Sequence, residues 1–189
     1  MLSINFEIYK DQDEYHTAVP EKTLMNLLEN DPAFTEELLR KNHRGHYGKL
    51  TINFYNHSLV VASETVWCLL FAVHLQAIKA IKKGETFRNF LENATGEYLT
   101  FDYVDARTTG VRIRYFGIMR YEDDNENDVY VSRTDYMKGE IIVPKNVYIT
   151  EMLNCISRFI EYRELITCTA PDDYFLSDFK KEVEALKLS

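Results

Sequence analysis

Hydrophobic and polar residues alternate at the start of the chain, and this period of two predicts a strand over residues 3–10. Two helical periods follow, one after Pro20 and one after Asp31, which precedes a second proline. Proline and aspartate both favour the start of a helix. Alternation returns over residues 50–54 and 59–62, with turn-forming residues between them. The first third of the chain therefore predicts a strand, two short helices and a hairpin.

The next segment is apolar and predicts the longest helix of the protein. Ser63 is expected to cap this helix, with Glu64 in the favourable first turn and Gly84 after its end. Hydrophobic residues cover so much of its circumference that we expect it to be buried, with His74 as a core histidine. The uncharged stretch ends at Lys79 and is shorter than the roughly 20 residues of a bilayer span, so no membrane segment is expected.

The second half begins with a short amphipathic segment that contains Phe87 and Phe90, and then it alternates again. Turn-rich connections, one of them Lys138–Gly139, join four predicted strands. These strands span residues 97–104, 110–121, 128–136 and 139–143. Helical periods after Pro144 and after Pro171 predict two further helices.

Together these elements predict a single α+β domain over residues 1–189. Its sheet is expected to be mainly antiparallel, with a C-terminal four-strand meander. The helices are expected to pack on one face, and one of them is the long buried helix. Alternating strand–helix–strand units, which would indicate a parallel sheet, are not predicted.

The charge of the chain limits its partners. There are 30 acidic and 22 basic residues, giving a net charge of −8, which opposes binding that depends on neutralising many phosphates. We therefore expect neither nucleic acid nor a membrane surface as the main partner. The charge is uneven, with −7 over residues 1–37, +6 over residues 38–121 and −7 over residues 122–189. These segments either screen one another within the fold or form an acidic face and a basic face that contains Arg112 and Arg114.

The expected compartment is the cytoplasm. Residues 1–7 lack the cationic start and the apolar run of a secretory signal. The three cysteines, Cys68, Cys155 and Cys168, are unclustered and odd in number. This suits buried, inert thiols in a reducing compartment better than a disulfide framework. No residue pattern requires a cofactor, so none is expected.

Three histidines form the main candidate for catalysis. His43, His46 and His57 lie close together in the sequence, and imidazoles at such spacing can share a metal ion or act as a general base. The loop that contains the first two has no carboxylate or cysteine to complete a metal site, so a solvated turn is the preferred interpretation. With Arg112 or Arg114 to hold phosphate, these histidines define the alternative function, a small phosphoester- or nucleic-acid-processing enzyme.

One predicted strand has part of the sequence signature of RNA-recognition sheets. Arg114, Phe116, Gly117 and Tyr121 match this signature, but two other positions hold different residue types and the predicted order of elements differs. Arg114 and Phe116 fall on one strand face, on which bases could stack. Arginine stems packed along apolar neighbours are the preferred interpretation of this face.

An acidic segment follows that strand. Residues 122–128 contain five carboxylates and no basic residue, but they lack the glycine and the ligand spacing of a calcium loop. The segment is expected to be a solvated hairpin tip or an acidic loop that recognises Lys or Arg of another protein. The expected partner contacts are Tyr121, Glu122, Asp123, Asp124, Glu126, Asp128 and Tyr130.

The preferred hypothesis is a non-catalytic, acidic interaction protein. The sequence has no nucleophile-elbow or phosphate-loop motif, whereas 13 tyrosines and 11 phenylalanines suit an interface with a basic protein. An immunity or antitoxin protein, which neutralises a basic toxin such as a nuclease, is one form of this hypothesis. The oligomeric state is left open.

Overall fold

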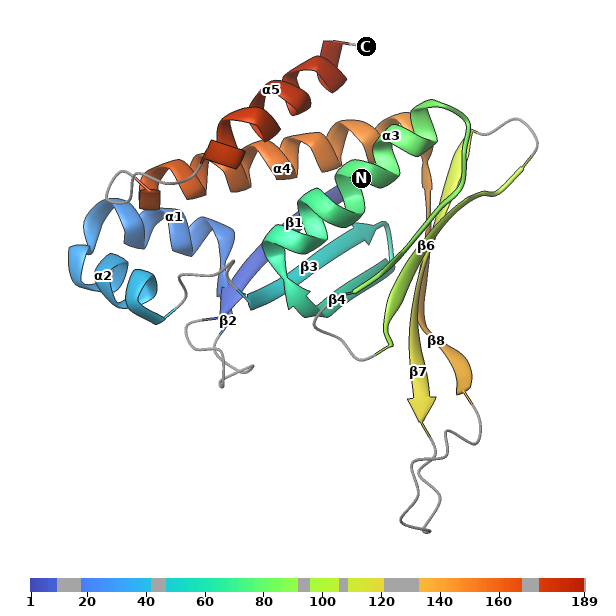
Figure 1. Cartoon of the computed structure of the whole chain (residues 1–189), viewed down its shortest axis with the longest axis horizontal. Coiled ribbons are helices and arrows are strands. Elements are labelled where there is room, and N and C mark those ends of the chain that lie inside the picture. The colour runs from blue at the N-terminus through green and yellow to red at the C-terminus, as the bar shows by residue number, and fades with distance from the viewer. Residues whose placement is uncertain are drawn as a thin grey trace.

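The computed structural model describes residues 1–9, 18–41, 47–91, 96–105, 109–120, 133–167 and 174–188 (Figure 1). Their strands form two four-stranded antiparallel sheets, where the sequence predicts a single one. Sheet A has the order β2-β1-β3-β4, with β1 (Leu2–Tyr9), β2 (Ala18–Pro20), β3 (Tyr47–Phe54) and β4 (His57–Thr65). Sheet B has the order β5-β6-β7-β8, with β5 (Phe87–Phe90), β6 (Tyr98–Tyr103), β7 (Gly110–Arg120) and β8 (Arg133–Pro144). The helices are α1 (Glu21–Asn30), α2 (Pro32–Lys41), the π-helical segment η1 (Cys68–Leu75), α3 (Gln76–Lys82), α4 (Lys145–Thr167) and α5 (Tyr174–Leu188).

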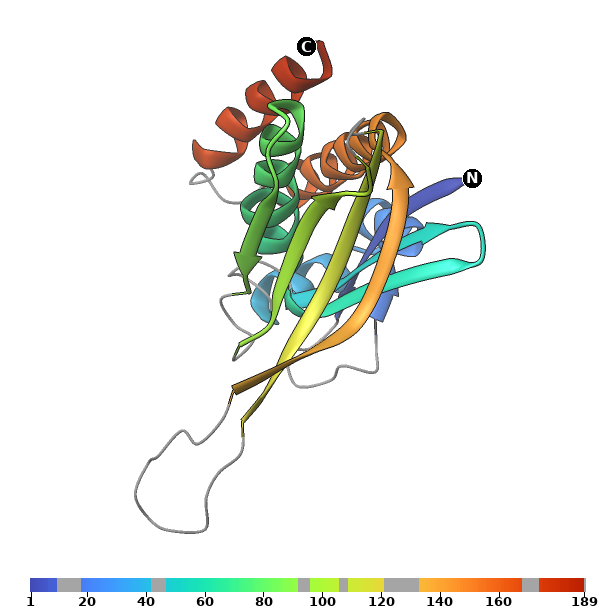
Figure 2. The same ribbon diagram turned by 90° about the vertical axis from the view of Figure 1, so that its right-hand side faces the viewer.

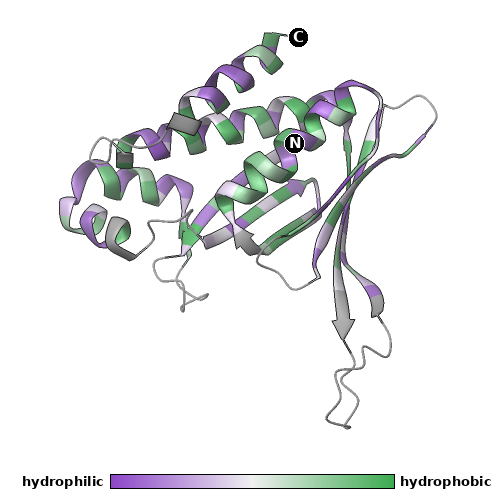
Figure 3. Ribbon diagram, in the orientation of Figure 1, coloured by the Kyte–Doolittle hydropathy of each residue, from purple (hydrophilic) through white to green (hydrophobic). Residues whose placement is uncertain are grey.

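Helices cover one face of each sheet, as the sequence predicts for an α+β protein. α4 packs on β1, β7 and β8, while η1 packs on β4 and α3 on β5. The covered faces are apolar, with Ile4, Phe6 and Ile52 of sheet A and Phe101 and Ile113 of sheet B almost fully buried. Hydrophobic and hydrophilic residues alternate along the strands (Figure 3), because successive side chains point to opposite faces of a sheet. Figure 2 shows the other face of sheet B, which no helix of the described residues covers.

The long apolar segment is a buried helix, but it begins later than predicted. β4 continues to Thr65 because Glu64 and Thr65 pair with β3, so Ser63 belongs to a strand and not to a helix cap. Thr65 takes that role, since its Oγ1 accepts a hydrogen bond from the backbone N–H of Cys68 at 3.2 Å. The chain is then helical from Val66 through η1 and α3. α4, with 23 residues, is longer than η1 and α3 together, which corrects the prediction of the longest helix.

His74 is a core histidine, as predicted, but among the described residues only its Nδ1, and not its Nε2, has a hydrogen-bond partner. It is fully buried in η1, and its Nδ1 lies 2.8 Å from the hydroxyl oxygen of Tyr148 in α4. Its ring also meets the ring of Phe101 in β6 edge-on, at 5.3 Å between centroids. Burial lowers the pKa of the imidazole from 6.5 to about 3, because the charged form would lose its hydration there. A neutral ring therefore joins η1, α4 and sheet B.

Sheet B is a four-strand meander, as predicted, but not with the four predicted strands: a single strand, β8, stands where two were predicted, and β5 completes the sheet at the other edge. The amphipathic segment around Phe87 is an edge strand, β5, which pairs with β6. The predicted turn at Lys138–Gly139 is wrong, because the chain stays in β8 there. The register between β7 and β8 shifts between Tyr115 and Phe116, which leaves Lys138 as the extra residue of a β-bulge.

A contact between the two sheets explains the glycine beside this bulge. A Cβ atom at Gly139 would lie 2.8 Å from Leu59 Cδ1 of β4, which is closer than such atoms pack without displacement. The glycine therefore allows β8 to approach β4 at the junction of the sheets, where these strands are in contact. Leu59 and Gly139 are distant in the sequence, so a local pattern contains no sign of this requirement.

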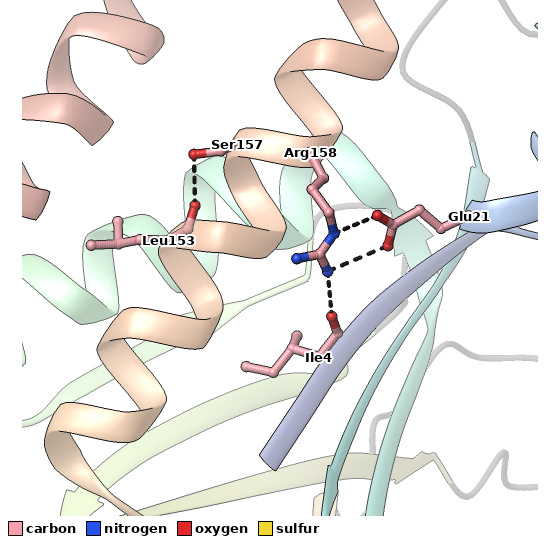
Figure 4. A network of polar contacts seen from close by, with 5 residues as sticks. All are labelled: Ile4, Glu21, Leu153, Ser157 and Arg158. Carbon is pink, nitrogen blue, oxygen red and sulfur yellow. Dashed lines mark hydrogen bonds and ion pairs between the residues drawn. The ribbon is translucent and has the colours of Figure 1, made fainter. Parts of the chain in front are cut away.

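Arg158 of α4 connects this helix to sheet A and to α1. Its Nη2 donates a hydrogen bond to the backbone oxygen of Ile4 at 2.8 Å, and its Nε and Nη2 both contact the Glu21 carboxylate (Figure 4). The planar guanidinium matches the geometry of a carboxylate. One side chain of α4 therefore bonds both to the backbone of β1 and to a side chain of α1. Residues 21 and 158 are 137 positions apart, and the sequence analysis did not identify this contact.

The other helices follow their predicted signals. At the start of α2, the backbone N–H of Phe34 donates a hydrogen bond to Asp31 Oδ1 at 3.1 Å, which is the expected capping contact.

Among the helices in the described part of the chain, none combines the length and the apolar character needed to cross a membrane.

Candidate interaction surface

The outward face of sheet B is the exposed side of β5, β6, β7 and β8 (Figure 2). Strand pairing places its side chains in rows that cross the sheet, and three of these rows span three or more strands. The first is the aromatic row, which consists of Phe90, Tyr98, Phe116 and Met137. The second consists of Arg88, Thr100, Arg114 and Glu140, and the third of Asp102, Arg112 and Ile142. Aromatic rings and guanidinium groups thus occupy neighbouring rows of one face.

The three rings of the aromatic row contact one another across the strands, and Met137 is the cross-strand neighbour of Phe116. The rings of Tyr98 and Phe116 stack at 4.8 Å between centroids with 14° between their planes, and Phe90 lies 5.3 Å from Tyr98. The Arg88 guanidinium lies over Tyr98 at 3.9 Å from the ring centroid and helps to bury it. Both ends of the row remain open to solvent, with Phe90 46% and Met137 56% exposed. Cross-strand pairs of this kind stabilise a sheet, yet the exposed ends add apolar area that the fold does not cover.

The arginines of this face are held in fixed positions. Arg114 forms an ion pair with Asp102, and Arg112 Nε lies 3.5 Å from Glu140 Oε2. Such pairs orient the guanidinium plane, and each of these side chains is about one third exposed, although the Nε atoms are buried. The structure therefore brings together Arg112 and Arg114, which the sequence analysis singled out, and places Arg114 on the same face as Phe116, as predicted.

The predicted acidic contact segment lies outside the described residues. All seven expected contacts fall within residues 121–132: Tyr121, Glu122, Asp123, Asp124, Glu126, Asp128 and Tyr130. The strands on either side are described up to Arg120 and from Arg133, and these two residues pair with each other. The segment therefore leaves and re-enters sheet B at the end of β7 and β8 that lies beyond the aromatic row.

Only one of the three candidate catalytic histidines lies in the described part of the chain. His43 and His46 fall outside it. His57 is exposed at the start of β4 and shares an open pocket of about 350 Å³ with Glu140, the ion-pair partner of Arg112. Among the residues that the structure describes, no three His, Cys, Asp or Glu side chains lie close enough to hold a metal ion.

The described cysteines are buried thiols. Cys68 and Cys155 lie in the core, and burial raises the pKa of the Cys155 thiol to about 12, which disfavours the reactive thiolate. This agrees with the prediction of inert cysteines for these two residues. Cys168 is outside the described residues.

The residues of the surface that the sequence analysis did not connect with it include Arg88, Phe90 and Met137. β5 has only four residues, which is too short for alternation to be recognised, and Met137 adjoins the bulge that was taken for a turn. The pattern over β6 and β7 was a usable signal for the part of the face that these two strands form.

No family model matches the chain, and no curated protein or solved structure matches it significantly.

Proposed function

We propose that the protein is a non-catalytic interaction protein that binds a basic partner protein through the outward face of sheet B. The observation that carries this proposal is the aromatic row, whose ends at Phe90 and Met137 are exposed. Protein interfaces are enriched in Tyr, Phe, Met and Arg, and aromatic and arginine residues supply most of their binding energy. The rows of sheet B have this composition.

The charge of the neighbouring segment favours a cationic partner. Residues 122–128 contain five carboxylates and are joined to the end of sheet B nearest the aromatic row. Negative potential at this end would accelerate the approach of a basic protein and orient it. The specific form that we propose is an immunity or antitoxin role, in which this surface covers the cationic active site of a toxin such as a nuclease.

Capture from a lysate of the organism that encodes the protein tests the surface. The bait is compared with a Phe90→Ser/Met137→Ser double variant and with a Thr51→Ala/Val60→Ser control, which alters the outward face of sheet A. A basic protein should be retained by the wild type and the control and lost from the sheet B variant. Retention of the same proteins by all three baits would reject the assignment of this face.

The purified partner then tests the acidic segment and the inhibitory role. Replacing Asp123, Asp124 and Glu126 together by serine should slow association and flatten its dependence on salt. A Glu29→Ser/Glu36→Ser/Glu161→Ser control makes the same change of net charge at exposed positions of other elements. Equal effects of the two triple variants would remove the segment from the interface, and undiminished toxin activity in the complex would remove the inhibitory role.

The alternative enzyme has one supporting observation, an open pocket whose lining includes both His57 and Glu140. An imidazole next to a carboxylate is a common arrangement for a general base. Hydrolysis of bis(4-nitrophenyl) phosphate by the purified protein, with zinc or manganese added and with a His57→Asn control, tests it. Turnover that is lost in the variant would favour the enzyme over the interaction protein.

A further inference from the structure

A separate cavity lies near the end of β7 and β8 where Gly110 pairs with Pro144, opposite the end where Arg120 pairs with Arg133. It has a volume of about 680 Å³ and is bounded by the end of α3, the start of α4 and the end of α5 (Figure 1). Three lysines line it, Lys82, Lys145 and Lys187, and no carboxylate is among the described residues that line it. The volume falls within the range of small-molecule sites. In a chain with a net charge of −8, this grouping of cations is a local reversal of sign.

The three lysines have different roles. Lys82 Nζ donates a hydrogen bond to the backbone oxygen of Leu186 and joins α3 to α5. Lys187 Nζ lies 3.0 Å from Glu184, but that glutamate is 59% exposed, and solvent weakens such a pair. The Lys145 ammonium lies over the ring of Tyr103, at 5.6 Å from its centroid. Lys145 and Lys187 are therefore the two cations able to turn toward a bound anion at low cost.

The position of Lys145 adds to the local positive charge. It is the first residue of α4, and the first turn of this helix contains no acidic residue. Helix starts usually carry Asp or Glu, because the N-terminal end has a partial positive charge. A lysine at this place is unfavourable in isolation, and a bound anion between Lys145 and Lys187 would relieve the repulsion.

The other side chains of the cavity define the rest of the ligand. Ile149, Leu153 and Leu186 give an apolar wall, while Asn146 and Thr150 provide an amide and a hydroxyl group. We infer that the cavity binds a phosphate-bearing small molecule with an apolar or aromatic body. The ammonium groups would hold the phosphate, and the apolar wall would cover the body. This site does not depend on the proposed interaction surface.

Phenyl phosphate is the probe, and its binding is followed by ¹H–¹⁵N NMR at constant ionic strength. Saturable shifts are expected in α3, α4 and α5 around the cavity. Inorganic phosphate should bind more weakly, since it lacks the apolar body, and benzoate more weakly, since it lacks the second negative charge. Shifts that do not saturate, or equal affinity for benzoate, would overturn the assignment.

Lysine variants provide the matched test. Lys145→Gln/Lys187→Gln should weaken phenyl phosphate binding by at least about tenfold, because two charge-assisted contacts are lost. Lys145→Arg/Lys187→Arg should retain binding, and Lys22→Gln/Lys181→Gln changes the net charge equally at lysines that do not line the cavity. Equal affinity of the first and third variants would overturn the site, and unchanged resonances of sheet A identify each variant as folded.

Discussion

Sheets A and B have the same number of strands and bury one face in the same way, but their outward faces differ. On sheet A the outward rows consist of Ser3, Asn53 and Ser58, then Asn5, Thr51 and Val60, then Glu7 and Lys49. Apart from Val60 these are polar residues, and the Glu7–Lys49 ion pair at 3.1 Å is partly exposed. On sheet B the corresponding positions hold aromatic and guanidinium groups that contact one another.

The outward face of sheet B has a composition that folding alone does not require. Burial of the inward faces stabilises both sheets, so neither outward face has to be apolar for the protein to fold. Sheet A has the serine, asparagine and threonine typical of a solvated surface, whereas sheet B has residue types that are enriched at interfaces. This difference is the reason for proposing sheet B as the binding face, with sheet A as its internal control.

The largest expected effect is a loss of stability in acid, caused by protonation of His74, which packs against sheet B. The pKa of His74 is about 3 in the folded protein and near 6.5 in the unfolded chain, so between these values the unfolded chain binds a proton that the folded protein does not. The contribution of neutral His74 to the free energy of unfolding is therefore fully present above about pH 6.5. It decreases as the pH is lowered, by about 3 kcal/mol at pH 4. Urea unfolding at pH 7 and pH 4 measures the change.

The His74→Gln variant isolates this contribution, since glutamine can bond to Tyr148 and does not titrate. It should be less stable at pH 7 but lose less stability between pH 7 and pH 4. The same pH dependence in both proteins would assign the acid sensitivity to other groups. Hydrogen exchange at pH 4 should increase first in β6, which contacts His74 through Phe101.

The next effect concerns binding. Phe116→Ala removes the ring that stacks on Tyr98 and should weaken the partner complex by about 2 kcal/mol, close to thirtyfold. Val60→Ala, at an exposed position of sheet A, should change affinity by less than about twofold. Titration calorimetry with the captured partner decides this, and similar losses in the two variants would break the proposed contrast between the faces.

The next prediction is that a single added methyl group at the junction of the two sheets lowers the stability of the protein. Gly139→Ala places a Cβ atom 2.8 Å from Leu59 Cδ1, and the displacement should cost about 1–2 kcal/mol of unfolding free energy. In a Leu59→Ala background the same substitution should cost less, because the clashing atom is gone. Additive losses in urea unfolding would show that this contact does not limit the approach of β8 to β4.

The smallest expected effect lies under sheet A. Arg158→Met removes the bonds to Ile4 and Glu21 while keeping an apolar stem, and it should cost about 1 kcal/mol of unfolding free energy because the guanidinium is partly exposed. Partner affinity should be unchanged. A loss of affinity measured by calorimetry would mean that the two sheets are coupled and that sheet A is not a neutral control.

Local periodicity predicted most elements of this fold because their signals are contained in short segments. The alternation over β1, β3, β6 and β7 and the proline and aspartate signals of α1 and α2 needed only neighbouring residues. The errors occurred where a distant partner decided the conformation. Pairing with β3 keeps Glu64 and Thr65 in a strand, and contact with Leu59 requires glycine at a position that resembles a turn.

The candidate surface was predictable only in part for the same reason. Arg114 and Phe116 share a strand, so their common face follows from the period of two. Phe90 and Met137 join them only through the pairing of β5 with β6 and of β7 with β8. The lysine cavity involves the ends of three helices, and no spacing in the sequence relates Lys82, Lys145 and Lys187.

The π-helical segment has a consequence for the helix that contains it. Its hydrogen bonds span one residue more than those of an α-helix, and one added residue rotates everything beyond it by about 100°. Before the segment Trp67, and within it Phe71, contact Phe179 of α5, whereas after it the backbone oxygen of Ile81 accepts a hydrogen bond from Tyr103 of β6. The wider turns thus set which residues of α3 face sheet B, among them Ile81, while the end of the helix stays joined to α5 through Lys82.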